Sequence, residues 1–283
     1  MKTTNLFKEI KSMLFGAQIE EFETEAKLIL RLAGCISAED IALGKDIEED
    51  SAKKLLELTQ KRAETKAPIQ YILGKCEFMN LIFSVNENTL IPRDETELLV
   101  LEAEKIIKKI QTNEKIKILD IGTGTGIIPI VLAYKFQKKV EILGVDISTK
   151  ALTVAIENAQ KYLESNIAIF RKSDLFSNIK EKFDIIISNP PYIPKKMKSK
   201  MQSEVLNFEP ETALFTDDDK GIEFYEKIIA EGKNYLKEGG FMLFELGINQ
   251  SKDVEAQFRA NGYKNIETTL DLAGIKRVIC AQI

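Results

Sequence analysis

Residues 116–126 read IKILDIGTGTG, and the rest of the predicted fold follows from this stretch. Residues 116–120 are mostly apolar and predict a buried strand, and the run from Ile127 to Phe136 predicts a helix directly after the glycines. Glycine allows a tight turn and lets a ligand approach the backbone closely. A strand, a glycine-rich turn and a helix in this order are typical of an open α/β sheet that binds a nucleotide-like ligand at the carboxyl ends of its strands.

The spacing of these glycines limits the kind of ligand. Gly122, Gly124 and Gly126 form a Gly-x-Gly-x-Gly pattern, whereas the dinucleotide fingerprint places its third glycine where this chain has Ile127. A pyrophosphate-binding site is therefore disfavoured. Because a glycine-rich loop alone is also compatible with an ordinary tight turn, other residues must identify the ligand.

Acidic residues after the next two predicted strands supply that information. The strand at residues 140–146 ends in Asp146, which can accept hydrogen bonds from both hydroxyls of a ribose. The strand from Asn166 to Phe170 is followed by Asp174, which can accept a hydrogen bond from an adenine amino group, and by Leu175, which can lie against the ring. Each acid taken singly also suits a helix cap. The glycine loop, Asp146 and the Asp174–Leu175 pair follow three successive strands, and together they favour a nucleoside-like ligand.

Strands and helices alternate from Lys115 to the end of the sequence. After the first strand and helix, further strands are expected at residues 140–146, 166–170, 183–188 and 241–246, helices at 148–163, 222–236 and 249–260, and a final pair of strands at 263–270 and 277–283. This alternation predicts a mostly parallel, Rossmann-like sheet of seven strands with helices on both faces. The hairpin pair at the end makes the last strand antiparallel.

The amino-terminal part of the chain has a different pattern of apolar residues. Residues 3–74 carry apolar side chains at helical spacing, as at Leu6, Ile10 and Leu14, and predict a set of helices without a chemical motif. Such a helical domain either docks a partner or only supports the rest of the chain. Residues 75–92 contain two short β-like runs around a turn and predict a hairpin linker.

Composition excludes several classes of function. Of the 283 residues, 44% are apolar and 30% are charged, as in ordinary globular proteins, and the net charge of −4 argues against a protein that wraps bare nucleic acid. No stretch approaches the roughly 18 apolar residues of a membrane span. The three cysteines lie far apart, which suits the reducing cytoplasm, and the sequence contains no histidine. Catalytic histidines and nearly all catalytic zinc sites are thereby excluded, so we expect no metal.

The tetrapeptide Asn189-Pro190-Pro191-Tyr192 follows the apolar run 183–188 and therefore lies at the same edge of the predicted sheet. Neither proline has a backbone N–H, and both prolines favour extended geometry before them, so the segment is stiff and rich in free carbonyls. The Asn189 side chain adds an acceptor and Tyr192 adds a flat ring. These groups can hold a planar –NH2 group by both hydrogens, although a proline-bounded loop with a structural asparagine is the simpler alternative.

At this point the sequence resembles the S-adenosylmethionine-dependent methyltransferases of the seven-strand class, and within them the release factor glutamine methyltransferases (the PrmC/HemK family). The similarity spans nearly the whole chain and includes PIQYILG at residues 68–74, IPRDETE at 91–97, DIGTGTG at 120–126, VDIS at 145–148, DLF at 174–176, SNPPYIP at 188–194, FEPETAL at 208–214 and DLAG at 271–274. The tetrapeptide is shared with methyltransferases that act on other amino nitrogens, whereas residues 91–97 and 208–214 are more particular. Asp94 departs from the family's usual proline, and either residue suits the start of a helix.

The resemblance implies an organisation and a substrate. Residues 1–74 would form a helical substrate-docking domain, 75–92 a hairpin linker and 93–283 the methyltransferase domain. The substrate would be the glutamine of the Gly-Gly-Gln motif in class-1 peptide chain release factors, methylated on its side-chain amide nitrogen (N5). S-adenosylmethionine would be the methyl donor, and S-adenosylhomocysteine the product. We further expect a cytoplasmic monomer without membrane or direct nucleic-acid contact.

The expected site residues fall into three groups. The catalytic residues are Asn189, Pro190 and Tyr192. For substrate binding we expect Asn189, Pro190, Pro191, Tyr192, Arg93 and Glu95. The expected cofactor-binding residues are Asp120, Gly122, Thr123, Gly124, Thr125, Gly126, Asp146, Asp174, Leu175 and Asn189.

A mechanism by positioning follows from the missing histidine. A glutamine amide is a poor nucleophile because its nitrogen lone pair is shared with the carbonyl. We expect Asn189 Oδ1 and the Pro190 carbonyl to accept the two amide N–H groups, while Tyr192 packs on the amide plane. Three alternatives share part of this chemistry: methylation of a ribosomal-protein glutamine, methylation of adenine N6 in nucleic acid, and a cofactor-binding protein without activity. The acidic composition argues against the nucleic-acid substrate.

Overall fold

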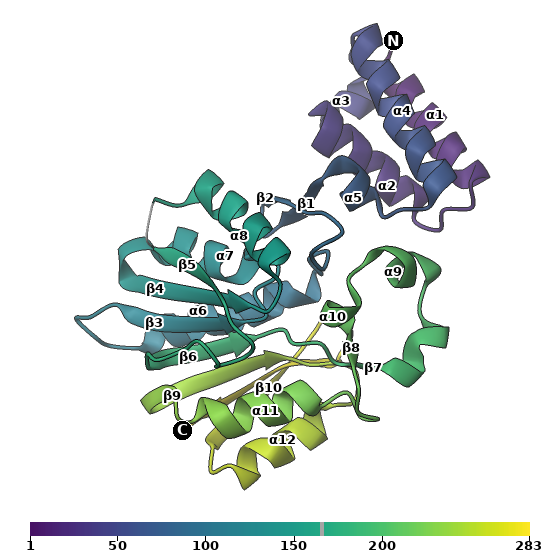
Figure 1. Cartoon of the computed structure of the whole chain (residues 1–283). Coiled ribbons are helices and arrows are strands. Elements are labelled where there is room, and N and C mark those ends of the chain that lie inside the picture. Colours follow the sequence, from purple (N-terminus) through teal and green to yellow (C-terminus); the bar gives the residue numbers. More distant parts are fainter. Residues whose placement is uncertain (165–166) are drawn as a thin grey trace. The chain divides into compact units, whose positions relative to one another are not determined.

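The computed structural model describes residues 1–164 and 167–283, and it divides the chain into two compact units (Figure 1). One unit comprises Met1–Lys75 together with Gln202–Phe208, and the other comprises Cys76–Met201 together with Glu209–Ile283. We call them the helical unit and the sheet unit. The start of the strand expected at Asn166 lies outside the described residues.

The helical unit forms because apolar side chains recur along one side of each of its helices. Its elements are α1 (Thr3–Gly16), α2 (Phe22–Leu28), the π-helical turn η1 (Ile29–Ala33), α3 (Ala38–Leu43), α4 (Glu49–Thr65), α5 (Ile69–Leu73) and α9 (Ser203–Phe208). Leu6, Ile10 and Leu14 of α1 are fully buried against Ala26 and Ile29, as their helical spacing predicts. The segment α9 joins this unit from a distant part of the sequence.

A buried ion cluster secures α9 within the helical unit. The Arg62 guanidinium of α4 donates to both carboxylate oxygens of Glu25 in α2, over 2.8 and 2.7 Å, and to Glu204 of α9 over 2.7 Å. The Arg62 and Glu25 side chains are 3% and 10% exposed. A guanidinium that is so well buried requires its carboxylate partners, so the cluster holds three separate elements together.

The sheet unit begins with a hairpin of β1 (Lys75–Phe78) and β2 (Leu81–Ser84), at the position expected from the sequence. The central sheet has the order β10-β11-β9-β6-β3-β4-β5. Its strands are β3 (Ile116–Ile121), β4 (Val140–Asp146), β5 (Ala168–Lys172), β6 (Phe183–Ser188), β9 (Leu236–Glu245), β10 (Lys264–Leu270) and β11 (Lys276–Gln282). Two-residue strands β7 (Ile193–Pro194) and β8 (Phe215–Thr216) pair separately.

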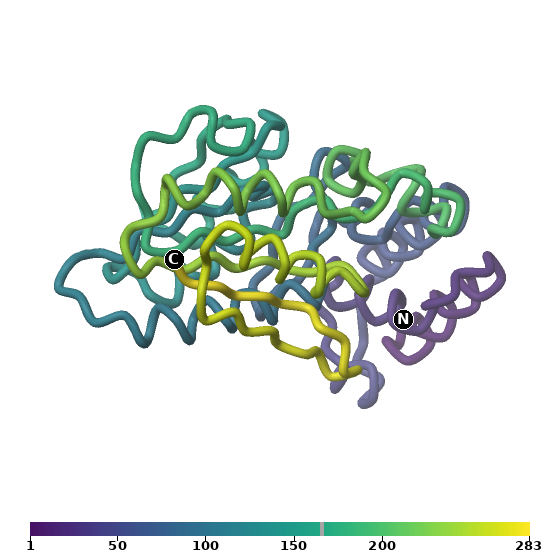
Figure 2. The backbone as a smooth tube through the Cα atoms, turned by 90° about the horizontal axis from the view of Figure 1, so that it is seen from below, coloured from purple at the N-terminus to yellow at the C-terminus, as the bar shows by residue number. Residues whose placement is uncertain are grey.

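The topology confirms the predicted seven-strand, mostly parallel sheet. Strands β5, β4, β3, β6 and β9 are parallel to one another, and β11 is antiparallel to both β9 and β10. The two C-terminal strands run side by side along the edge of the sheet, in yellow in Figure 2. The strands after β3 are added on one side of it, as β4 and β5, and then on its other side, beginning with β6. At such a change of strand order, the carboxyl ends of the parallel strands border a crevice.

The largest difference from the predicted boundaries lies between α11 and β9. The helix expected at residues 222–236 ends earlier, as α11 (Glu223–Gly232), and β9 already begins at Leu236. Leu236 pairs with Phe183 of β6, and the Phe183 N–H donates to the Tyr235 carbonyl over 2.8 Å. Pairing with a neighbouring strand therefore overrides the helical spacing of these residues.

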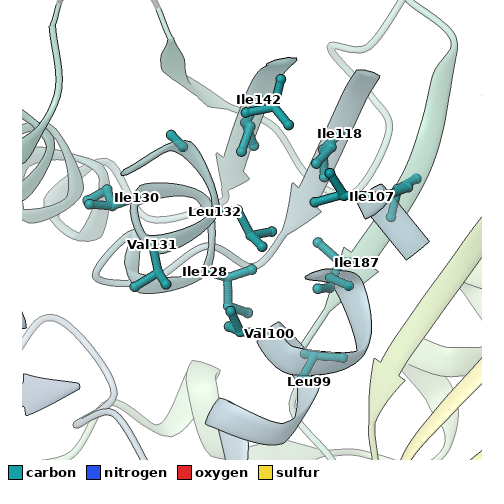
Figure 3. Packing of buried hydrophobic residues seen from close by; sticks show 14 of the residues in the cluster. Leu99, Val100, Ile107, Ile118, Ile128, Ile130, Val131, Leu132, Ile142 and Ile187 are labelled. Carbon is teal, nitrogen blue, oxygen red and sulfur yellow. The ribbon is translucent and has the colours of Figure 1, made fainter. Parts of the chain in front are cut away.

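Two apolar layers cover the two faces of the sheet. On one face, α6 (Glu95–Lys109), α7 (Ile127–Phe136) and α8 (Thr149–Tyr162) cover β3, β4 and β6. Figure 3 shows Leu99 and Val100 of α6 and Ile128 and Leu132 of α7 among the strand side chains. On the other face, α11 and α12 (Ser251–Ala260) cover the sheet through their buried side chains.

The remaining short elements are η2 (Gln137–Lys139), η3 (Lys195–Lys200) and α10 (Glu211–Leu214). Within the described ranges, no helix is both long and apolar enough to cross a membrane.

Candidate active site

A cavity of about 370 Å³ lies where the carboxyl ends of β3, β4 and β6 meet. Many of the residues predicted for the site line it together: Gly122, Gly124, Asp146, Asp174, Leu175, Asn189, Pro190 and Pro191. Other predicted residues lie outside this lining: Arg93, Glu95, Asp120, Thr123, Thr125, Gly126 and Tyr192. The topology thus brings the glycine loop, two acids and most of the tetrapeptide to one cavity.

The glycine loop between β3 and α7 has a backbone that requires glycine. Gly122 and Gly124 have φ angles of 73° and 53°, and a Cβ atom on either would meet nothing within 4 Å, because both face open space. Gly126, with φ 78°, instead packs tightly: a Cβ atom there would lie 3.0 Å from that of Ala155. The first two glycines therefore leave room for a ligand, whereas the third brings α7 close to α8.

Asp146 at the end of β4 is fixed by backbone donors. Its Oδ2 accepts from the Gly124 N–H and its Oδ1 from the Ser148 N–H, each over 2.9 Å. Burial raises the pKa of this carboxyl, and the backbone hydrogen bonds partly offset that rise. Each oxygen keeps a lone pair for a further donor. The carboxylate is thus held at the cavity wall with both oxygens able to accept from a further donor.

The turn after β5 presents Asp174 and Leu175 to the cavity. Leu175 has a φ of 45°, a conformation that costs energy for a residue with a side chain. The Ser173 hydroxyl donates to the Leu175 carbonyl over 2.8 Å, and the Asp174 N–H donates to the Ser177 hydroxyl over 3.1 Å. These bonds stabilise the strained turn and leave the exposed Asp174 side chain beside the cavity.

Asp120 lies beneath the glycine loop rather than in the cavity wall. It is completely buried, and neither carboxylate oxygen has a hydrogen-bond partner, nor does the nearby Thr123 hydroxyl. Burial raises the pKa of Asp120 from 3.8 to about 7, Thr123 lowers it slightly, and the charge of Asp146 raises it further. Asp120 is therefore a buried acid, without a hydrogen-bond partner, that titrates near neutral pH.

The tetrapeptide is held from several sides. Ser188, just before it, donates from its hydroxyl to the Ile121 carbonyl over 2.6 Å, which ties β6 to β3. Gln250 Nε2 donates to the Tyr192 carbonyl over 2.8 Å and to the Gly221 carbonyl over 3.0 Å. Gly221, with φ 73°, passes so close that a Cβ atom would lie 2.2 Å from the Tyr192 carbonyl oxygen. The segment that carries Asn189 therefore has a fixed backbone.

A polar chain behind the tetrapeptide was not predicted from the sequence. Asn189 Nδ2 donates to Thr96 Oγ1 over 3.2 Å, and the Thr96 hydroxyl donates to Glu245 Oε2 over 2.6 Å. The Tyr192 hydroxyl donates to Glu245 Oε1 over 3.4 Å. The one available signal was an acid that directly follows the apolar run 241–244 at the end of a strand.

Glu245 is a buried acid with an unusual ionisation. Burial raises its pKa to about 7, the hydrogen bond from Thr96 lowers it, and the neighbouring Glu95 raises it. The hydrogen bond from Tyr192 and the charge of Arg277 lower it by smaller amounts. Burial and the Glu245 charge in turn raise the pKa of the Tyr192 phenol.

Arg93 and Glu95, both predicted for substrate binding, make contacts within the protein. Arg93 forms an ion pair with Glu209, whose carboxylate also accepts from the Ile91 N–H over 3.2 Å. The side chain of Glu95 is 44% exposed and lies 3.7 Å from Arg277. The ion pair joins the two particular stretches at residues 91–97 and 208–214, so these motifs meet in space.

Comparison with known proteins agrees with this arrangement. The family model described as Methyltransferase small domain matches residues 102–211. A protein from Streptococcus pneumoniae named release factor glutamine methyltransferase is 37% identical over 284 residues, which cover 99% of this chain and 98% of that protein. The chain belongs to the release factor glutamine methyltransferase family. A family member from Clostridium acetobutylicum is 39% identical over an aligned region that covers 83% of this chain and 82% of that protein.

Solved structures place this family member in a wider fold class. The hMettl16 catalytic domain, solved in complex with the MAT2A 3′UTR hairpin 6, aligns with a TM-score of 0.57 at 16% identity, over 87% of this chain and 86% of that one. At that identity the likeness concerns the fold, and it confirms the Rossmann-like methyltransferase architecture predicted from the alternating strands and helices.

Proposed function

We propose that this protein transfers a methyl group from S-adenosylmethionine to the side-chain amide nitrogen of the glutamine in the Gly-Gly-Gln motif of class-1 peptide chain release factors. The observation that carries the proposal is that Asn189 and Pro190 line the same cavity as the glycine loop and Asp146. Family membership narrows the acceptor from any amino nitrogen to a protein glutamine.

The cavity fits the proposed methyl donor. Gly122 and Gly124 have no side chain and open space before them, Asp146 offers oxygens for a ribose, and Asp174 and Leu175 stand where the base would lie. S-adenosylmethionine supplies a methyl group on a positively charged sulfur. Asp146 at the cavity wall would help to stabilise that cation, and a bound cation would in turn favour the ionised form of Asp120, whose buried carboxyl has no hydrogen-bond partner.

The residues at the other end of the cavity position the glutamine amide. Asn189 Nδ2 is engaged by Thr96, so Oδ1 is the atom left for a substrate N–H, and the Pro190 carbonyl is the second acceptor. Two such acceptors fix the amide plane and increase electron density at its nitrogen. As the new N–C bond forms and the methyl–sulfur bond breaks, the nitrogen gives up one proton, which passes to water. Positioning of this kind can supply about 7–11 kcal/mol of the barrier.

Tyr192, predicted to pack on the amide plane, lies outside the cavity lining, and its hydroxyl is bound to Glu245. Its role in stacking on the substrate stays a prediction. Arg93 is proposed to act on the substrate through the shape of the segment at residues 208–214, since it anchors Glu209 of that segment. A role of Glu95 in substrate binding stays a prediction.

The test is methylation of a purified class-1 release factor with radiolabelled S-adenosylmethionine. We expect label in the wild-type factor and none in its Gly-Gly-Ala variant. Label in both factors, in neither, or only in a ribosomal protein would refute the proposal. In the enzyme, Asn189→Ala should lose transfer while still binding the methyl donor, and Asn265→Ala, the same change at an exposed site in β10, should retain it.

A further inference from the structure

The chain Asn189–Thr96–Glu245 has a defined direction of hydrogen bonding. An ionised carboxylate can only accept, so the single hydroxyl proton of Thr96 is donated to Glu245, over 2.6 Å. Thr96 Oγ1 can then only accept, and it accepts from Asn189 Nδ2 over 3.2 Å. The charge of Glu245 therefore decides which end of the Asn189 amide faces the cavity.

We propose that Thr96 and Glu245 are positioning residues that hold the Asn189 amide with its oxygen toward the substrate, an inference that rests on the proposed function of this site. Thr96 is 2% exposed and Glu245 is 1% exposed, and neither lines the cavity, so both act through Asn189 rather than on the substrate. A reversed Asn189 amide would present its two N–H donors to a substrate that itself offers N–H donors. Such an amide could not accept a hydrogen bond from the glutamine N–H group.

The same geometry makes the site sensitive to pH. The groups that face Glu245 are Thr96 and Glu95 of α6, Tyr192 after β6 and Arg277 of β11, and the Tyr225 hydroxyl of α11 donates to the Glu245 backbone carbonyl. Burial raises the pKa of Glu245 to about 7, so the carboxyl becomes protonated just below neutral pH. A neutral carboxyl can donate or accept, and the Asn189 amide then loses its fixed direction.

Three variants separate this role from a structural one. Thr96→Val removes the hydroxyl at nearly constant volume, Thr96→Ser restores it, and Glu245→Gln removes the charge. Loss of one hydrogen bond corresponds to a fall of about 2- to 10-fold in kcat/KM for the release factor in Thr96→Val and Glu245→Gln, with recovery in Thr96→Ser. The KM for S-adenosylmethionine should stay unchanged, because these residues do not line the cavity.

Matched controls use the same chemical changes elsewhere. Thr59→Val removes a buried hydroxyl that donates only to the Leu55 carbonyl in its own helix, and Glu104→Gln removes a buried carboxylate on α6 that pairs with Lys135. Both should retain wild-type kcat/KM. In addition, kcat/KM of the wild type at saturating S-adenosylmethionine should fall as the pH drops below 7, and this acidic limb should be absent in Glu245→Gln.

An NMR measurement that needs no methyl transfer keeps the proposal testable even if the methyl acceptor is not a release factor. In protein labelled with ¹⁵N-asparagine, the Asn189 side-chain amide signal, assigned from its loss in Asn189→Asp, should shift between pH values well below and well above 7. That shift should be missing in Thr96→Val. An Asn189 signal that does not respond to pH, or a Thr96→Val enzyme as active as wild type, would overturn the inference. Absent methylation of the release factor by the wild type would refute only the proposed function.

Discussion

Replacing Asp120 with asparagine should stabilise the ligand-free protein at alkaline pH, and the gain should shrink as the pH falls. The folded-state pKa of Asp120 lies at about 7 rather than 3.8. A raised acid pKa contributes stability that is fully present below the unfolded-state pKa, and this stability is lost progressively as the pH rises from the unfolded-state value to the folded-state value. With about 1.4 kcal/mol for each pKa unit, ionising Asp120 in the folded protein costs about 4 kcal/mol of unfolding free energy.

The assay is urea denaturation followed by circular dichroism, for wild type and Asp120→Asn, at pH values of about 5 and about 8. Glu245 is also buried with a raised pKa and contributes the same trend to both proteins, so it cancels in the difference. We expect the variant to be more stable than wild type by about 4 kcal/mol at the higher pH and by only about 1.5 kcal/mol at the lower pH, which already lies above the unfolded-state pKa of 3.8. Asp174→Asn, at an exposed carboxylate, is the control and should show no such difference.

A difference between Asp120→Asn and wild type that does not change with pH would refute this reasoning. It would mean that the ionised Asp120 carboxylate is stabilised in the folded protein by a hydrogen bond or a positive charge that its described surroundings do not contain.

Three further changes test other parts of the structure. Asp146→Asn should weaken S-adenosylmethionine binding about 10-fold or more in calorimetry, because a charged acceptor is lost. Gly221→Ala should lower the melting temperature more than Gly262→Ala does, since both glycines have positive φ but only the first would meet the Tyr192 carbonyl, at 2.2 Å. Equal losses would contradict the clash. Arg62→Met should cost about 3 kcal/mol in urea denaturation, because the buried Glu25 carboxylate loses its guanidinium partner; a cost near zero would contradict the importance of this pair.

The sequence predicted those parts of the site that follow directly from strand ends. The glycine loop, Asp146 and Asn189 each come after an apolar run, and parallel strands bring their carboxyl ends to one edge. The helix at residues 127–136 has the predicted bounds, and its first seven residues are apolar and buried.

The rest depends on contacts between distant residues. Thr96 and Glu245 are separated by 149 positions, and neither carries a local pattern that points to the other. Arg93 shows the same limit, because its partner Glu209 is 116 positions away and no local pattern connects the two residues. The early end of α11 also depends on a distant contact, because Leu236 pairs with Phe183 of β6 in the sheet.

The discontinuous make-up of the helical unit has a consequence for how the chain is made. Glu204 follows Arg62 by 142 positions, so a ribosome working at 5–20 residues per second needs roughly 7 to 30 s to reach it. During that interval Arg62 has Glu25 alone as a carboxylate partner, and α9 does not yet exist. The nascent helices must therefore wait for most of the sheet to be synthesised before their own fold is complete.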